Sequence, residues 1–280
     1  MISVWLREIL YERFIRGIQG GYADEEGSLC GSRSAMVFSP HFDDETLGCG
    51  GTIIRKTRVG TRVQIVFMTD GSTSHRSLVS GETLTKMRSA EGVNAAINLG
   101  LKPDNVTLLG FKEGALASES ERAAKRVSEL IEEENPDEIF IPHRSEPLLW
   151  SADHRETTRI VKKALGLLGR NPIVLEYPVW YWYHWPWVGI DILEHNYRKV
   201  ILKNTLSQLF GLRIGRDFNY GVRIGGVLAQ KEKALEEHKS QMSRIIPDKE
   251  WITLRDISGG QFLECFFREY EIFLRYKFQG

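Results

Sequence analysis

The 280-residue sequence has few cysteines, no excess of either charge and no long apolar run. Its three cysteines, Cys30, Cys49 and Cys265, form no Cys-x-x-Cys pair, which predicts a cytoplasmic protein without a disulfide framework. Lys and Arg number 37, as do Asp and Glu, so the net charge is zero and nothing indicates a nucleic-acid partner. Because no run of about 18 apolar residues occurs, no transmembrane segment is expected.

The first 21 residues also lack the features of a signal peptide. Charges interrupt this segment early, and no apolar core precedes a small-residue cleavage site. The segment predicts an amphipathic helix that packs on the rest of the protein.

Short apolar runs alternate with helical segments between residues 35 and 180. Strict alternation of this kind predicts an α/β, Rossmann-like fold with a mainly parallel sheet and helices on both faces. The strands are expected at 35–40, 62–70, 105–110, 137–142 and 172–180. The helices are expected at 45–60, at 83–100, from Ser118 or Ser120 to just before Pro136, and at 151–169.

The last 90 residues are less regular and predict a C-terminal elaboration of the same fold. The stretch 264–276 is compatible with a helix, a strand or one after the other. No linker or low-complexity stretch separates the parts of the chain. We therefore expect one domain, with an N-terminal helix and loop over 1–34, an α/β core over 35–176, and an aromatic loop with further elements over 177–280.

The stretch SPHFDDETLG places His41, Asp43 and Asp44 directly after the first expected strand. In open parallel sheets, ligands bind at the carboxyl ends of the strands. Residues three apart share a face in the first turn of a helix, so His41 and Asp44 can point at a common spot, with Asp43 beside it.

A second cluster follows the fourth expected strand, where HRSEPLLWSADHRE contains His143, Asp153 and His154. A catalytic zinc takes about three protein ligands and leaves one position for water. Two clusters of histidine and carboxylate at two strand ends therefore indicate a metal site. The structural alternative is that the carboxylates lie in the first turns of helices, where they face the helix dipole.

Six motifs, in order along the chain, carry a resemblance to a known family. SPHFDDETLGCGG closely resembles the Pro-His-x-Asp-Asp-Glu signature of the LmbE-like, or PIG-L, family of metal-dependent N-deacetylases. MTDG, MRSAEGVNAAINLG, ADHRE, KEKALEEHKSQ and FLECF are similar to further motifs of that family. The matches run from about residue 37 to about residue 266.

This resemblance implies that His41, Asp44 and His154 bind a divalent cation, most simply zinc, with Asp43 as the general base. It also implies that Asp153 lies beside His154 and orients it. Zinc lowers the pKa of bound water to near neutrality, and Asp43 then takes a proton from the water and passes one to the leaving amine. Acetate and a free amine are the expected products.

One position departs from the family pattern. Many members have His-x-Asp-His at the second metal motif, whereas this chain has Ser151 in place of the first histidine. A serine hydroxyl cannot carry the positive charge of an imidazolium. His143, His184 and His238 are the candidates for the missing role, and the sequence does not choose among them.

Three residues are candidates for substrate binding, each with a structural alternative. The resemblance places Arg88 where family members contact polar or anionic substrate groups; alternatively it lies on a solvated helix face with Glu91. Asp70 lies at the same edge of the sheet, or serves the Asp-Gly turn. His238 matches the histidine of the late family helix, or lies on a half-exposed helix face.

The segment 177–187, YPVWYWYHWPW, has seven aromatic residues. Flat aromatic faces suit the apolar faces of sugar rings, which makes Trp182 a candidate to bind a glycoside. The alternative, with at least equal support, is a loop that fills the core or an oligomer interface.

Together these features predict a zinc-dependent hydrolase that removes an acetyl group from an N-acetylglucosamine-type amide. The expected partner is a small glycoside, glycolipid or glycan precursor with an N-acetyl group, and a homo-oligomer is left open. The alternatives are a weak or inactive sugar-binding member of the same fold, and an amidase for a non-sugar natural product. A nucleotide-binding domain is disfavoured, because GCGGT lacks G-x-G-x-x-G spacing.

Overall fold

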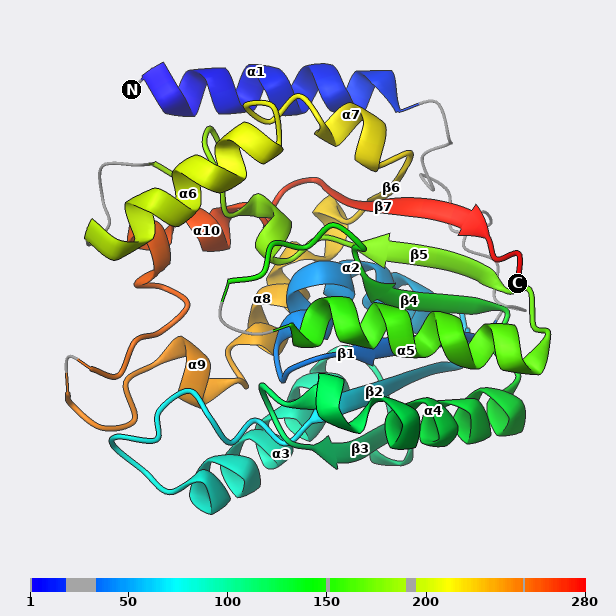
Figure 1. The fold of residues 1–280 in the computed structure, drawn as a ribbon. Coiled ribbons are helices and arrows are strands. Elements are labelled where there is room, and N and C mark those ends of the chain that lie inside the picture. Colours follow the sequence, from blue (N-terminus) through cyan, green and yellow to red (C-terminus); the bar gives the residue numbers. More distant parts are fainter. Residues whose placement is uncertain (1, 19–33, 150–151, 190–194, 249) are drawn as a thin grey trace.

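A seven-stranded sheet forms the centre of the protein (Figure 1). The computed structural model describes residues 2–18, 34–149, 152–189, 195–248 and 250–280. The strand order is β3-β2-β1-β4-β5-β7-β6. The strands are β1 (Ala35–Ser39), β2 (Val63–Thr69), β3 (Val106–Phe111), β4 (Glu138–Pro142), β5 (Ile173–Tyr177), β6 (Tyr220–Arg223) and β7 (Tyr270–Lys277).

The five strands expected from the alternating pattern are all present, and they are parallel to one another. β7 then pairs with β5 in the antiparallel sense, and β6 pairs with β7 in the same way. The predicted fold class is therefore confirmed. The stretch 264–276, which the sequence left open, contains the end of a short helix followed by β7.

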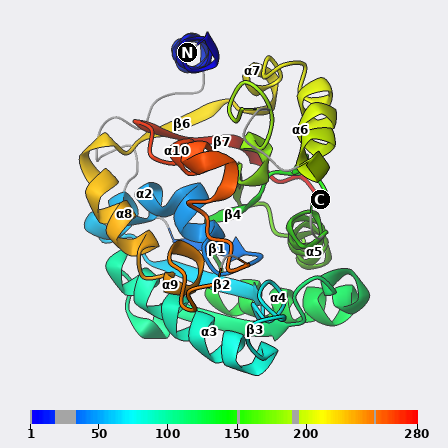
Figure 2. The same ribbon diagram turned by 90° about the vertical axis from the view of Figure 1, so that its left-hand side faces the viewer.

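Helices cover both faces of the sheet (Figure 2). One face carries α2, α3 and α8, and the other carries α4 and α5. Side chains alternate along the buried strands, so Val37 belongs to one hydrophobic cluster while Met36 and Phe38 belong to the other. These helices are α2 (Asp44–Arg58), α3 (Gly81–Asn98), α4 (Ser120–Glu134), α5 (Asp153–Leu168) and α8 (Leu228–Leu235).

The remaining helices lie beyond the edge of the sheet formed by β6 or beside its carboxyl ends (Figures 1 and 2). In α1, the side chains of Tyr11, Phe14 and Ile15 are buried in the core, as expected for an amphipathic helix that packs on the protein. Among the described helices, none combines the length and the apolar character needed to cross a membrane. These elements are α1 (Ile2–Gly17), α6 (His195–Ser207), α7 (Ile214–Asp217), α9 (Lys239–Met242) and α10 (Gln261–Glu264).

The strand order reverses between β1 and β4, which are neighbours in the sheet although β2 follows β1 in sequence. Such a switch point leaves a crevice at the carboxyl ends of the two strands, because their connections leave toward opposite faces. The segments that follow β1 and β4 carry the two predicted clusters. The fold thus brings together two parts of the chain that are more than 100 residues apart.

Candidate metal centre and active site

The turn from β1 into α2 has a strained backbone at its centre. Asp43 has φ 121° and ψ −30°, outside the regions that a residue with a side chain normally adopts. Such a conformation costs about 1 to 3 kcal/mol and persists only where neighbouring contacts impose it. Here the backbone N–H of Asp43 donates to Glu45 Oε2 over 3.1 Å.

Glu45 holds this turn from inside the protein. Its carboxylate is fully buried and accepts hydrogen bonds from Ser39 Oγ at 3.2 Å and Thr46 Oγ1 at 2.6 Å. His238 Nε2 lies 3.0 Å from Glu45 Oε1. His238 is itself fully buried, which rules out the alternative of a half-exposed helix face. Its contact with Glu45 gives it a structural role beneath the turn.

Gly48 shows why the motif needs a glycine. A Cβ atom at this position would lie 2.2 Å from Cδ2 of Tyr177, a distance that side chains do not tolerate. The Tyr177 hydroxyl in turn donates to the carbonyl of Phe38 over 2.8 Å. The end of β5 therefore packs directly on the start of α2.

His41, Asp44 and His154 come together above this turn. Each offers one ligand atom, and these atoms lie within 4.8 Å of one another. His41 Nδ1 and His154 Nε2 are both 3.3 Å from Asp44 Oδ2. The structure thus brings into one place the three residues that the resemblance implies as metal ligands.

The chemistry of this cluster fits a divalent cation. Both ring nitrogens of His154 are buried and have no hydrogen-bond partner among the described residues, which is costly unless another group satisfies them. Burial lowers the pKa of His154 to about 4, which keeps the ring neutral, the state in which imidazole binds metals. Two imidazoles and one carboxylate, with room for water, are typical of catalytic zinc sites.

Asp153 lies beside a different histidine from the one expected. Its Oδ2 is 3.2 Å from His41 Nε2, and it also accepts a hydrogen bond from the backbone N–H of Gly114 over 2.6 Å. Within the described parts of the chain, neither ring nitrogen of His154 forms a hydrogen bond. The expectation that Asp153 orients His154 is therefore wrong, because the first residue of α5 points toward β1 and holds the ring of His41.

The carboxylate behind His154 is Glu146, which the sequence reasoning missed. Its Oε2 lies 3.6 Å from His154 Nδ1, and the residue is fully buried. The carboxylate also accepts backbone N–H groups from Val179, Trp180 and Tyr181, at 2.9, 2.6 and 3.1 Å. Burial outweighs these donors and raises the pKa of Glu146 to about 8. A glutamate eight residues before a histidine carries no periodic signal, so only the structure reveals this contact.

Asp43 lies beside the three candidate metal ligands and has contacts of its own. The side-chain amide of Gln241 donates to Asp43 Oδ2 over 2.5 Å. Burial, followed by the charges of Asp44 and Glu45, raises the pKa of Asp43 well above its usual range. A cation at the cluster would lower this pKa again. Asp43 is therefore placed to take up and release a proton.

None of the three candidates for the missing motif histidine presents an exposed ring. His143, His184 and His238 are exposed by 2%, 0% and 0%. His143 packs against Phe218, with ring centroids 4.8 Å apart. His184 Nδ1 lies 2.7 Å from the carbonyl oxygen of Tyr181. Ser151, which occupies the motif position, lies outside the described residues.

Arg88 and Asp70 are both engaged in the loop after β2. Arg88 is only 3% exposed, and it donates to the carbonyl of Gly71 over 3.1 Å and to Ser74 Oγ over 2.5 Å. Asp70 accepts hydrogen bonds from the N–H and hydroxyl of Ser72 at 3.2 and 2.7 Å. A solvated helix face is therefore wrong for Arg88, and the contacts of Asp70 favour its turn role.

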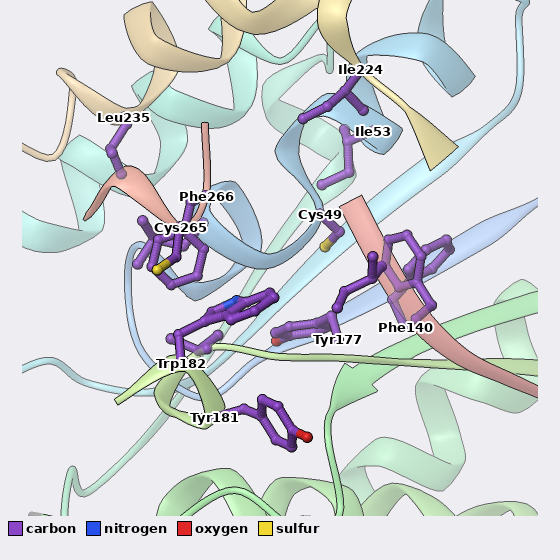
Figure 3. Close-up of a cluster of buried hydrophobic side chains, with 14 of the residues drawn as sticks. Cys49, Ile53, Phe140, Tyr177, Tyr181, Trp182, Ile224, Leu235, Cys265 and Phe266 are labelled. Atoms are coloured by element: carbon purple, nitrogen blue, oxygen red, sulfur yellow. The ribbon is translucent and has the colours of Figure 1, made fainter. Parts of the chain in front are cut away.

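The aromatic segment fills the core rather than lining an open site. Trp182 is 3% exposed and makes an edge-to-face contact with Trp187, with ring centroids 5.1 Å apart. Figure 3 shows Trp182 and Tyr177 inside the larger hydrophobic cluster. The burial of Trp182 leaves its ring no exposed face, which favours the alternative of a loop that fills the core over a sugar-binding platform.

Comparisons with known proteins agree with this geometry. The family model described as GlcNAc-PI de-N-acetylase, PIG-L, matches residues 36–165. A probable N-acetyl-alpha-D-glucosaminyl L-malate deacetylase 2 of Bacillus cereus is 30% identical over 242 residues, covering 82% of this chain and 96% of the relative. Diacetylchitobiose deacetylase of Thermococcus kodakarensis is 26% identical over 220 residues, covering 78% of this chain and 72% of the relative.

A solved structure shows the same fold. N,N'-diacetylchitobiose deacetylase from Pyrococcus horikoshii, in complex with an inhibitor, aligns with a TM-score of 0.60 at 22% identity and covers 99% of this chain and 93% of its own. The motif, the cluster of donors and the relatives lead to one assignment. The chain belongs to the PIG-L family of de-N-acetylases and is accordingly a hydrolase of the deacetylase class.

Proposed function

We propose that this protein is a zinc-dependent deacetylase that hydrolyses the N-acetyl amide of a glucosamine-type sugar in a small glycoside, glycolipid or glycan precursor. The observation that carries the proposal is the cluster of His41, Asp44 and His154, with donor atoms within 4.8 Å, next to a carboxylate outside the cluster. That carboxylate belongs to Asp43. A hydrolytic metal site requires protein ligands for the metal and a nearby general base, and these residues can supply both.

In this proposal His41, Asp44 and His154 hold the cation. When bound, the ion supplies a Lewis acid that polarises the amide carbonyl and acidifies a water molecule. Asp153 fixes the ring of His41 through Nε2, and Glu146 faces Nδ1 of His154. Each imidazole then directs its other nitrogen toward Asp44, as ligand histidines do when a carboxylate lies behind them.

Asp43 is the proposed general base. Gln241 occupies Oδ2 of its carboxylate, which leaves Oδ1 for the proton of the attacking water. As the amide C–N bond breaks, the protonated carboxyl passes this proton to the leaving nitrogen. The products are acetate and a free amine, and the carboxylate is regenerated for the next cycle.

The substrate class is supported by the relatives. One is named for a glucosaminyl malate and the other for diacetylchitobiose, so both names contain an N-acetylated glucosamine unit. A cytoplasmic location is part of the proposal. Cys49 and Cys265 are buried free thiols, which suits a reducing compartment.

Acetate release from diacetylchitobiose and from N-acetylglucosaminyl malate tests the proposal. We expect turnover that a chelator abolishes and that added Zn²⁺ restores. Asp43→Ala should lower kcat by about 10²- to 10⁴-fold, the usual contribution of a general base. Asp104→Ala, which removes an exposed carboxylate from the loop before β3, is the matched control and should leave turnover unchanged.

The outcome that contradicts the proposal is equally definite. Purified protein that holds no metal, and whose turnover on these amides does not respond to Asp43→Ala, is not a metal-dependent deacetylase of this class. Release of acetate from a non-sugar N-acetyl amine, with none from either sugar, would keep the chemistry but replace the substrate.

A further inference from the structure

A group of large apolar side chains is exposed at the end of α6. Leu202 and Leu206 lie on the helix, and Leu209, Phe210 and Leu212 follow it. Each of the five exposes between 51% and 66% of its surface. We call these five residues the α6 face. Exposed apolar residues are common singly, but five within eleven residues of the chain indicate a contact surface.

The backbone at this helix end makes the choice of residues unusual. Leu209 has φ 47° and Phe210 has φ 56°, both in the left-handed region. Helices often end with a residue in this region, but it is usually glycine or asparagine, which adopt it at low cost. Bulky residues gain nothing for the backbone here. The turn therefore presents two bulky apolar side chains at a backbone cost that glycine would avoid.

Cationic residues are frequent in the stretch of chain that carries the α6 face. Between residues 195 and 217 the chain has five, whereas Asp217 is the sole acid. Asp217 is buried and already pairs with Arg213 and Arg216, at 3.2 and 3.4 Å. The whole chain has a net charge of zero, whereas this stretch has a clear excess of positive charge. The five cations are Arg198, Lys199, Lys203, Arg213 and Arg216.

We propose that the α6 face docks on the surface of an anionic lipid bilayer. Leucine and phenylalanine side chains enter the boundary between headgroups and acyl chains, while the cations of the same stretch meet the negative lipids. Trp185 lies against Phe210, with ring centroids 6.1 Å apart, and tryptophan is enriched at this depth of a membrane. α6 has 13 residues, fewer than the roughly 20 needed to span a bilayer, so the contact is interfacial.

A second copy of the chain is a poorer occupant. A symmetric dimer built on this face would place the same patch against itself, and so bring the lysines and arginines of one copy against those of the other. Anionic lipids complement both properties of this stretch, its exposed apolar residues and its excess of positive charge. The α6 face does not include the residues of the proposed metal centre, so the docking proposal can be tested independently of the catalytic one.

Co-sedimentation of the full chain with vesicles tests the docking. We expect binding to vesicles of phosphatidylcholine with phosphatidylglycerol that is at least about tenfold tighter than to phosphatidylcholine alone. This binding should weaken with added NaCl, because salt screens the charges. Absence of binding to the anionic vesicles, or equal binding to both kinds, overturns the proposal.

Variants separate docking from folding. Phe210→Asn should weaken vesicle binding by about tenfold or more, because the variant lacks the phenylalanine ring that enters the bilayer. The melting temperature should stay the same or rise, because asparagine adopts a positive φ at lower cost. Lys199→Glu with Lys203→Glu should weaken binding to anionic vesicles by at least about tenfold. Leu167→Gln and Lys125→Glu alter exposed residues on α5 and α4 and should leave binding unchanged.

Two further results would also contradict the proposal. One is a wild type that binds anionic vesicles while Phe210→Asn and the double lysine variant bind equally well. The other is a wild-type dimer that Phe210→Asn converts to a monomer in size-exclusion chromatography with light scattering. The second result would make the α6 face a contact between copies of the chain.

Discussion

Gln241 donates a hydrogen bond from its side-chain Nε2 to Oδ2 of Asp43, with 2.5 Å between the two atoms. Asp43 has φ 121°, and its backbone N–H is fixed by Glu45. The proposed base is therefore held at both its main chain and its carboxylate. Gln241 lies in the late motif KEKALEEHKSQ, where sequence reasoning had singled out only His238.

Gln241→Leu should lower kcat by about tenfold while leaving the metal content unchanged. Leucine has a similar size but no amide, so Asp43 would lose the donor that fixes its orientation, and positioning of this kind strongly affects proton transfer. Steady-state kinetics and metal analysis of the same preparation measure the two quantities. Loss of metal together with activity would show that Gln241 supports the metal site rather than the base.

Glu146→Gln should weaken metal binding by about 10- to 100-fold, the usual effect of removing the carboxylate behind a ligand histidine. An amide cannot ionise, so it cannot supply the carboxylate that would face His154 Nδ1 when the cation is bound. Competition with a chromophoric chelator measures this affinity without any substrate. The experiment therefore stays informative even if the natural substrate is a different amide.

The control for this variant is Glu138→Gln, because Glu138 is also a buried carboxylate. It pairs with Lys56 over 2.5 Å at the opposite, amino end of β4. We expect this change to lower the melting temperature but leave metal affinity as in the wild type. Equal weakening by both variants would mean that general loosening of the fold, not the contact with His154, sets the affinity.

The sequence allowed a correct prediction of where the three candidate metal ligands lie, because two local sequence patterns together place them at one edge of the sheet. Apolar runs of strand length alternate with helical segments, and polar clusters follow the first and fourth runs. Such a chain forms a parallel sheet whose strand ends share one edge. His41 and His154, 113 residues apart, could thus be expected at one site before any contact was known.

The side-chain contacts could not be predicted in the same way. Asp153 precedes His154 in sequence but faces His41, because neighbours in the first turn of a helix point in different directions. Trp182 and its aromatic neighbours have the composition of a sugar platform, yet burial decides their role, and burial depends on tertiary packing. His75, in the loop after β2, is likewise buried, and its ring stacks on that of Trp251 with centroids 4.3 Å apart.

A kink in α2 has its own buried partner. Cys49 has non-helical angles, φ −146° and ψ 16°, which interrupts the helical hydrogen bonds. Glu271 accepts the N–H groups of Gly51 and Thr52, each over 2.7 Å, much as a capping residue does at a helix start. Glu264 in the FLECF motif pairs with Arg7 instead, so it takes no part in capping this kink.

Lys231→Met should destabilise the protein by about 3 to 5 kcal/mol, since it would leave a buried charge without its partner. Lys231 is fully buried and donates to Glu271 Oε1 over 2.8 Å and to the carbonyls of Leu47 and Phe266. Urea denaturation measures the change in free energy of unfolding. Lys239→Met, at an exposed lysine on α9, should shift it by less than about 0.5 kcal/mol. A small effect of Lys231→Met would mean that this ion pair is not isolated from water.

Glu176 makes the stability depend on pH in the acid range. Burial opposes its ionisation, but the hydrogen bond from Arg144 and the charge of Lys162 outweigh it and lower the pKa to about 2, against an ordinary value of 4.5. Because the pKa is lower in the folded than in the unfolded state, ionised Glu176 stabilises the fold by about 3 kcal/mol above pH 4.5. This stabilisation is lost as the pH falls from 4.5 toward 2. Glu176→Gln should therefore be less stable than the wild type at neutral pH, with a difference that shrinks below pH 4.5 in urea melts. Glu133→Gln, at an exposed carboxylate on α4, should show no such convergence, and a constant difference for Glu176→Gln would assign its effect to packing rather than charge.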